Sequence, residues 1–166
     1  MRLAVISDTH VPGREARVPD WVRERLRAAD HVIHAGDFDA PETLDLVRDL
    51  AGGDANLTAV RGNVDPPGVD LPATATLSVG GVRFFVTHGA GSHAGYRERV
   101  AGVVRDEAGR DAVGVCGHTH RYLDATTDGV RLLNPGSATG ARPATTASMM
   151  SVDVEDGALS VARISP

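Results

Sequence analysis

The sequence predicts an α/β protein in which two β-sheets pack face to face, with helices on their outer sides. Residues 1–63 alternate short apolar runs with amphipathic segments, which indicates a β-α-β-α-β order and a parallel sheet with right-handed crossovers. From residue 74 onward most of the apolar runs are short and several are joined by tight turns, which indicates further strands and a second sheet.

The first half of the chain is expected to contain three strands and two helices. Strands are predicted at residues 3–6, 31–35 and 57–60. The first helix begins at Pro19-Asp20 and carries Trp21, Val22 and Leu26 at helical spacing. The second helix covers residues 41–50, with proline at its start and Gly52 just beyond its end.

The second half is expected to open with a hairpin around Gly80-Gly81 and to contain one helix, at residues 92–108, with Tyr96, Val100, Val103 and Val104 facing inward. Asp128-Gly129 and Asp156-Gly157 predict two further tight turns. The predicted strands lie at residues 74–79, 82–87, 112–116, 122–126, 130–133, 148–154 and 159–164.

Length and composition restrict the function further. The 166 residues suit one domain, which we expect to span residues 1–166. The net charge of -5 argues against a stable nucleic-acid complex and against docking on an anionic membrane. Cys116 is the single cysteine, and the first apolar run is too short for a signal peptide or a membrane span, so we expect a cytoplasmic protein.

Metal-ligand residue types follow directly after five of the predicted strands. The ligands of parallel sheets bind at the carboxyl ends of strands, so these segments are expected to converge on one crevice. Residues i and i+2 of an extended segment point the same way, which suits a shared ion. The mixture of carboxylate, imidazole and amide favours Mn, Fe, Zn, Ni or Co. The segments are Asp8-Thr9-His10, Gly36-Asp37, Gly62-Asn63, His88-Gly89 and Gly117-His118-Thr119-His120.

These five motifs, in this order, resemble those of the calcineurin-like metallophosphoesterase superfamily. Within it, Gly62-Asn63-Val64-Asp65 and Asn134-Pro135-Gly136-Ser137 are similar to segments of the small prokaryotic phosphodiesterases of the YfcE type. The resemblance covers nearly the whole chain. It implies a four-layer α-β-β-α sandwich of two mixed sheets flanked by helices, which agrees with the order of elements predicted above.

The resemblance also implies a dinuclear centre that holds two divalent metal ions, with manganese the first expectation and Ni, Co, Fe or Zn as alternatives. A hydroxide that bridges the ions would attack a phosphodiester in line. Asp37, Asn63 and His118 would act in catalysis, and Asn63 and Arg61 would bind substrate. Asp8, His10, Asp37 and His120 would hold the first ion, and Asp37, Asn63, His88 and His118 the second, with the Asp37 carboxylate bridging.

Val64 departs from the superfamily pattern. Many members have a histidine there, which contacts the scissile phosphate, and valine has no proton to give. Poor leaving groups suffer most from this loss, so we expect hydrolysis of small phosphodiesters or nucleotide-like esters with good leaving groups. Asp65 and His93 are candidates to replace the missing donor. For Arg61, a structural ion pair is an alternative to contact with phosphate.

Other residues have simpler interpretations. His34 is expected to be a packed residue, with donation to a carboxylate as one role open to it, and His31 is expected to be solvated. Cys116 is expected in the core. The segment 89–94 fits the loose G-x-G-x-x-A dinucleotide pattern, but its strand belongs to a hairpin, so we do not expect cofactor binding there. Loop 136–147 is predicted to be the most mobile segment.

Two other functions remain open at this point. The first is a phosphomonoesterase that uses the same metals. The second is a non-catalytic binding module like the retromer subunit of this fold, which would be expected to have lost ligands. A homo-oligomer is also possible.

Overall fold

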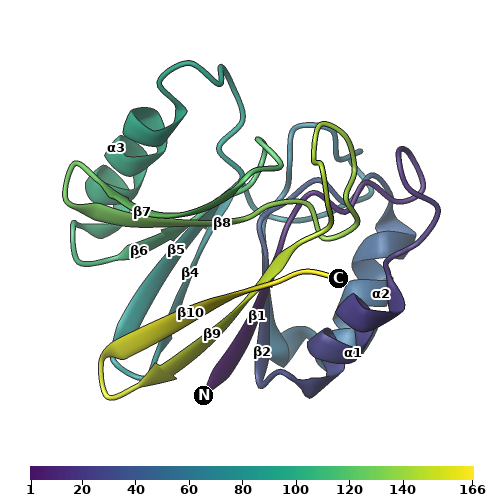
Figure 1. Cartoon of the computed structure of the whole chain (residues 1–166), viewed down its shortest axis with the longest axis horizontal. Helices are drawn as coiled ribbons and strands as arrows, with labels where there is room; N and C mark the ends of the chain where they lie inside the picture. Colours follow the sequence, from purple (N-terminus) through teal and green to yellow (C-terminus); the bar gives the residue numbers. More distant parts are fainter.

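The computed structural model describes all 166 residues, and its elements follow the predicted order (Figure 1). The helices are α1 (Asp20–Ala28), α2 (Pro41–Ala51) and α3 (Tyr96–Ala108), with a short 3-10 turn η1 (Asp54–Asn56) after α2. None of them has the length and apolar character needed to cross a bilayer. The strands are β1 (Arg2–Ile6), β2 (His31–His34), β3 (Leu57–Ala59), β4 (Thr74–Val79), β5 (Val82–Thr87), β6 (Val113–Val115), β7 (Tyr122–Thr127), β8 (Val130–Pro135), β9 (Met149–Glu155) and β10 (Ala158–Ile164).

Both sheets are five-stranded and mixed. The first has the order β10-β9-β1-β2-β3, in which β1, β2 and β3 are parallel as predicted and β9 is antiparallel to β1. The second has the order β4-β5-β6-β8-β7, with β6 parallel to both of its neighbours. The predicted turns at 80–81, 128–129 and 156–157 all have positive φ at both residues, as a two-residue type I′ turn requires.

Three apolar layers hold the sheets and helices together. One layer lies between the first sheet and helices α1 and α2, with Val22, Leu26 and Val47 in it. The middle layer lies between the sheets and includes Val5, Phe84 and Leu133. The third packs α3 on the second sheet. The expected four-layer α-β-β-α sandwich is therefore confirmed, with α3 on one side of Figure 1 and α1 and α2 on the other.

Helix α3 differs from the prediction in two details. It starts at Tyr96 and not at residue 92, because Gly95 adopts a left-handed conformation with φ of 68°. Val103 is 38% exposed, since the inward stripe runs through Tyr96, Val100 and Val104 at four-residue spacing. The prediction that Val103 faces inward is wrong, because it lies about 100° around the helix from Val104, toward the exposed side.

Leu133→Ala should show how much stability the middle layer contributes. Leu133 is fully buried between the sheets, so truncation should lower the free energy of unfolding by about 2–5 kcal/mol. Urea unfolding followed by circular dichroism measures this loss. The matched control is Val103→Ala, which should cost less than about 0.5 kcal/mol at its exposed position. Equal losses for the two variants would contradict the assigned core.

Candidate metal centre

The predicted ligands gather at the carboxyl ends of the strands, in the loops at the top of Figure 1. Asp8 and His10 follow β1, Asp37 follows β2, His88 follows β5 and His120 follows β6. All five side chains are almost completely buried, although all are polar. Their ligand atoms form two overlapping groups in which every pair lies within 4.8 Å, one of Asp8, His10 and His120 and one of Asp8, Asp37 and His88.

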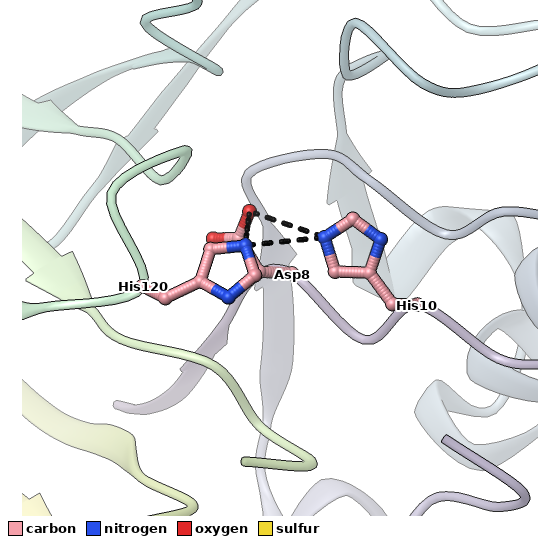
Figure 2. A group of neighbouring side chains, drawn as sticks. All are labelled: Asp8, His10 and His120. Atoms are coloured by element: carbon pink, nitrogen blue, oxygen red, sulfur yellow. Dashed lines mark hydrogen bonds and ion pairs between the residues drawn. The ribbon is translucent and has the colours of Figure 1, made fainter. Parts of the chain in front are cut away.

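The first group is drawn in Figure 2, where the nitrogen atoms of two imidazoles and a carboxylate oxygen face one another. Nε2 of His10 lies 3.2 Å from Nε2 of His120. Oδ1 of Asp8 lies 3.3 Å from Nε2 of His120 and 3.9 Å from Nε2 of His10. Asp37 Oδ2 lies 3.5 Å from Nε2 of His10 and so connects this group to the second.

The second group extends outward to two more predicted ligands. Nε2 of His88 lies 3.2 Å from Oδ2 of Asp37 and 2.9 Å from Oδ1 of Asn63. Nδ1 of His118 lies 3.1 Å from the same oxygen of Asn63. Asn63 is exposed and His118 is half-buried, so this side of the centre opens to solvent. All seven predicted ligands are thus brought together.

The partners of the outer ring nitrogens show where the protons lie. Nδ1 of His88 lies 2.7 Å from the Ala35 carbonyl, and Nδ1 of His120 lies 2.7 Å from the Ala141 carbonyl. A carbonyl oxygen only accepts, so both Nδ1 atoms carry a proton, and in the neutral rings both Nε2 atoms carry a lone pair. In the same way, Nε2 of His118 donates to the Gly91 carbonyl at 2.9 Å, which leaves Nδ1 unprotonated.

His10 completes the set, because its Nδ1 lies 2.7 Å from the Asp39 carboxylate. With the rings neutral, the centre is lined with lone pairs: ring nitrogens, carboxylates and an amide oxygen face one another. Buried acceptors at these distances repel unless a cation lies among them. Outer partners of this kind are also what orients histidine ligands in metal sites. The residues fit a metal ion on this observation.

The backbone at the centre is unusual as well. Asp8, His10, Asp37, Asp39, His118 and His120 all have positive φ, between 47° and 77°. Left-handed residues other than glycine are uncommon, and they concentrate at functional sites. Glycine is required at Gly62 and Gly117, where a Cβ atom would collide with the Asp37 carboxylate and with Ser7 and Asp8 respectively.

Comparison with known proteins agrees with this centre. The family model described as the calcineurin-like phosphoesterase superfamily domain matches residues 1–157. The chain belongs to this superfamily. A probable metallophosphoesterase of Methanocaldococcus jannaschii is 34% identical over 157 residues, which are 94% of this chain and 77% of that protein.

Solved structures with the same fold cover the whole chain. A Thermotoga maritima protein solved by NMR in solution is 32% identical, with a TM-score of 0.76 and 99% of each chain covered. Vps29 of Entamoeba histolytica, crystallised in complex with zinc, is 29% identical, with a TM-score of 0.78 and 99% of each chain covered. This chain is therefore a phosphoesterase homologue whose fold and candidate ligands support binding of divalent metal ions.

The sequence interpretation missed the role of Asp65 in this phosphoesterase. Its carboxylate accepts four backbone N–H groups, those of Asp37, Phe38, Asp39 and Gly62, at 2.6–3.0 Å. It was expected as a candidate proton donor, but a carboxylate surrounded by four donors is held as an acceptor. Asp65 instead ties the loop after β2 to the loop after β3.

The Asn134-Pro135-Gly136-Ser137 segment also ties ligand-bearing loops together, those that follow β1 and β6. The Asn134 amide donates to the Gly117 carbonyl at 2.9 Å and to Thr119 Oγ1 at 3.2 Å. Ser137 Oγ donates to the Asp8 carbonyl at 2.7 Å. The segment joins the loops that carry Asp8, His118 and His120. Its first residues are buried, and exposure begins only at Arg142, so the first half of the loop predicted to be mobile is packed in place.

The carbonyls of the 89–94 segment, which resembles a dinucleotide motif, bind an arginine side chain. Arg99 donates to the carbonyls of Gly89, Ala90 and Ser92 at 2.8–3.1 Å and fixes the loop that carries the Gly91 carbonyl. The loop after β5, the second strand of the hairpin as expected, therefore directs carbonyls at an arginine. It serves to orient His118.

The charged groups of the centre shift one another's pKa. Burial alone lowers the pKa of His120, but its contact with Asp8 outweighs burial and the pKa is raised. Burial also lowers the pKa of His88, but contact with Asp37 outweighs burial and the pKa is raised. The pKa of Asp37 is lowered, since burial, which acts the other way, is outweighed by His88. The Asp8 and Asp37 carboxylates thus favour a positive charge beside them, which a metal ion or a proton on these imidazoles can supply.

Three simpler expectations have mixed outcomes. Cys116 is fully buried, and burial raises its pKa to about 12, which confirms a core residue and not a nucleophile. His34 is packed as expected, stacked on Phe38, but it donates to Thr9 Oγ1 at 3.3 Å and not to a carboxylate. The solvated position expected for His31 is wrong: it is buried and lies 2.8 Å from Thr58 Oγ1. His31 begins β2, and the neighbouring strand β3 covers this end of it.

The residues expected near substrate lie at the rim. Arg61 is exposed, forms no ion pair, and lines a cavity of 460 Å³ together with Asn63 and His88. The alternative structural ion pair is therefore not made. The ring of His93 lies edge-on to that of His118, with centroids 5.3 Å apart. Val64 is 41% exposed beside the centre.

Asp65→Asn should weaken metal binding. The amide nitrogen of asparagine would face two of the four N–H donors, so the loop that carries Asp37 and Asp39 loses part of its anchor to the loop after β3. We expect the Mn²⁺ affinity of the chelator-treated protein, measured by titration calorimetry, to fall about 10- to 100-fold. Asp70→Asn, at an exposed position in the same segment, is the control and should bind as wild type does. Unchanged affinity in Asp65→Asn would overturn the role given to Asp65.

His34 should make the metal-free protein sensitive to acid. Complete burial lowers its pKa from 6.5 to about 3, so the unfolded chain binds a proton that the folded chain does not. The stabilisation is present above pH 6.5 and is lost as the pH falls toward 3, with a slope of up to about 1.4 kcal/mol per pH unit. Urea unfolding between pH 4 and 8 should show a shallower slope for His34→Gln than for the wild type. Identical slopes would contradict this account.

Proposed function

We propose that the protein is a phosphodiesterase that holds two divalent metal ions and hydrolyses small phosphodiesters. The observation that supports this most is the set of buried metal-ligand atoms that face one another in the centre, with no ligand of the superfamily pattern lost. The first ion would be held by Asp8, His10, Asp37 and His120, and the second by Asp37, Asn63, His88 and His118.

The bound ions would supply a nucleophile from water near neutral pH and would neutralise charge on the phosphate oxygens. One water is consumed, the bond from phosphorus to the leaving oxygen breaks, and a phosphomonoester and an alcohol are formed. Mn²⁺ is our first choice of metal, with Ni, Co, Fe and Zn as alternatives. The zinc complex of the Vps29 relative supports the capacity of this fold to hold such ions.

The side chains of this chain would position the substrate around that chemistry. Asp37 lies between the two groups, where its carboxylate contacts ligands of both. Asn63 and His118 line the solvent side, where a phosphate enters. Arg61 projects from the same rim without an acidic partner, so its guanidinium is free for a phosphate oxygen.

The preference for diesters follows from the lack of a proton donor for the leaving group at Val64. Val64 stands where a proton donor would help an alkoxide depart, so esters with good leaving groups are favoured. His93 is the remaining candidate donor, since it packs on His118 and is exposed. The buried single cysteine suits the cytoplasmic location that we also propose.

The direct test uses bis(p-nitrophenyl) phosphate with the Mn²⁺-loaded protein. Asp37→Ala should lower kcat/KM at least 100-fold, because a ligand to both ions is lost, and elemental analysis should show less than the two ions expected per wild-type chain. Asp70→Ala is the matched control at an exposed carboxylate. A clear preference for p-nitrophenyl phosphate would favour the monoesterase alternative. No bound metal and no hydrolysis with any of the five metals would favour a binding module.

A further inference from the structure

The cavities around the metal centre differ in charge from the rest of this acidic protein. Three cavities share a wall with a predicted ligand histidine, and each is lined by arginine: Arg61 beside His88, Arg14 beside His10, and Arg121 beside His120. None of these arginines takes part in an ion pair. A cavity at the opposite end of β9, next to the turn to β10, is lined by Asp153, Glu155 and Asp156 and contains no arginine.

The Arg14 cavity lies on the other side of the centre from the Arg61 cavity. It measures 390 Å³, and its walls are His10, Pro12, Gly13, Arg14, Asp39 and Val64. Asn63 and Val64 are neighbours in the chain, yet Asn63 lines the first cavity and Val64 the second. A phosphate bound at the centre therefore has a cavity on each flank, and a diester has one substituent for each.

Arg14 is held in place but keeps most of its donors. Its Nη1 donates to the Arg142 carbonyl at 2.9 Å, which anchors the side chain across the loop that carries Ala141. An arginine has five N–H donors in a planar fork, so the others are available to a phosphate. Asp39 is the one acid in the lining. Its side chain is 15% exposed, and its Oδ1 faces His10 Nδ1, which leaves Arg14 as the exposed charge.

The chemistry of the walls indicates what fills this cavity. Arg14 is the one cationic side chain in this lining, and the only acid beside it, Asp39, is engaged with His10, so Arg14 is the group that a ligand charge would meet. An arginine without an acidic partner, in a cavity beside a centre that holds cations, attracts a second anion. We propose that the substrate is a phosphodiester that carries an additional terminal phosphate, and that Arg14 binds this phosphate. The proposal rests on the proposed phosphodiesterase function.

The test compares two substrates with the same leaving group. They are the p-nitrophenyl ester of thymidine 5′-monophosphate and the same ester with a 3′-phosphate, both given to the Mn²⁺-loaded protein. We expect the additional phosphate to raise kcat/KM about tenfold, mainly through KM, because it adds charge-assisted hydrogen bonds. In Arg14→Gln the ratio between the two substrates should fall to about 1.

Two further variants locate the effect. Arg25→Gln removes the same charge from an exposed position on α1 and should keep the tenfold ratio. Arg61→Gln should lower hydrolysis of both substrates alike. No preference in the wild type, a preference that survives in Arg14→Gln, or one abolished by Arg61→Gln alone would each overturn the proposal.

Failure of the phosphodiesterase function would look different, since neither ester would be hydrolysed. Binding of the two corresponding nucleotides, thymidine 5′-monophosphate and thymidine 3′,5′-bisphosphate, is then measured by calorimetry. Tighter binding of the bisphosphate that is lost in Arg14→Gln supports the phosphate site independently of catalysis. Equal binding of the two nucleotides to the wild type rejects it.

Discussion

The fixed orientation of the four histidine rings is the constraint on which the centre depends. Each ring donates a proton outward, to the Ala35, Gly91 or Ala141 carbonyl or to the Asp39 carboxylate. In the neutral ring, the other nitrogen therefore has its lone pair aimed inward, where a metal ion can bind it. Three of the four outer partners are backbone atoms, so the main-chain path of the loops itself sets the protonation of the ligands.

That main-chain path is strained, and hydrogen bonds between loops offset the strain. Left-handed residues other than glycine cost on the order of 1–3 kcal/mol each, and six of them lie at the centre. Asp65 ties two of the loops together with four N–H bonds. Asn134 and Ser137 tie the others to β8 and to the end of β1. Residues that touch no ion thus determine where the ligands stand.

The sequence is sufficient to predict the features that depend on apolar periodicity and on residue type, which are the helices, the strands and the candidate ligands. Apolar periodicity locates all three helices and all ten strands within a few residues, since it reflects burial directly. Ligand types after strands, together with the family resemblance, identify the residues that converge. Neither source shows the roles of Asp65 and Asp39. In the sequence, an acidic loop residue that donates a proton cannot be told from one that accepts backbone N–H groups. Only the folded loops distinguish these two roles.

The same limit explains His31 and Arg61. His31 begins a strand, and its burial depends on pairing with β3, which is 26 residues further along the chain. For Arg61, an ion pair and a free guanidinium were equally consistent with the sequence, because the choice depends on acids from other elements. The sequence shows a glycine at position 95 but not its left-handed conformation, which delays the start of α3.

The charge around the centre connects the missing proton donor to the choice of substrate. With Val64 at the leaving side, the chain gives up one means of lowering the barrier. Interactions with remote parts of a substrate are another, because they orient the reacting phosphate and restrict its motion before the bond breaks. Arg14 and Arg61, on opposite flanks of the centre, would hold a phosphodiester at two points. A substrate that carries a second phosphate would use both, so Arg14, in the Val64 cavity, would compensate through binding for the proton transfer that valine cannot supply.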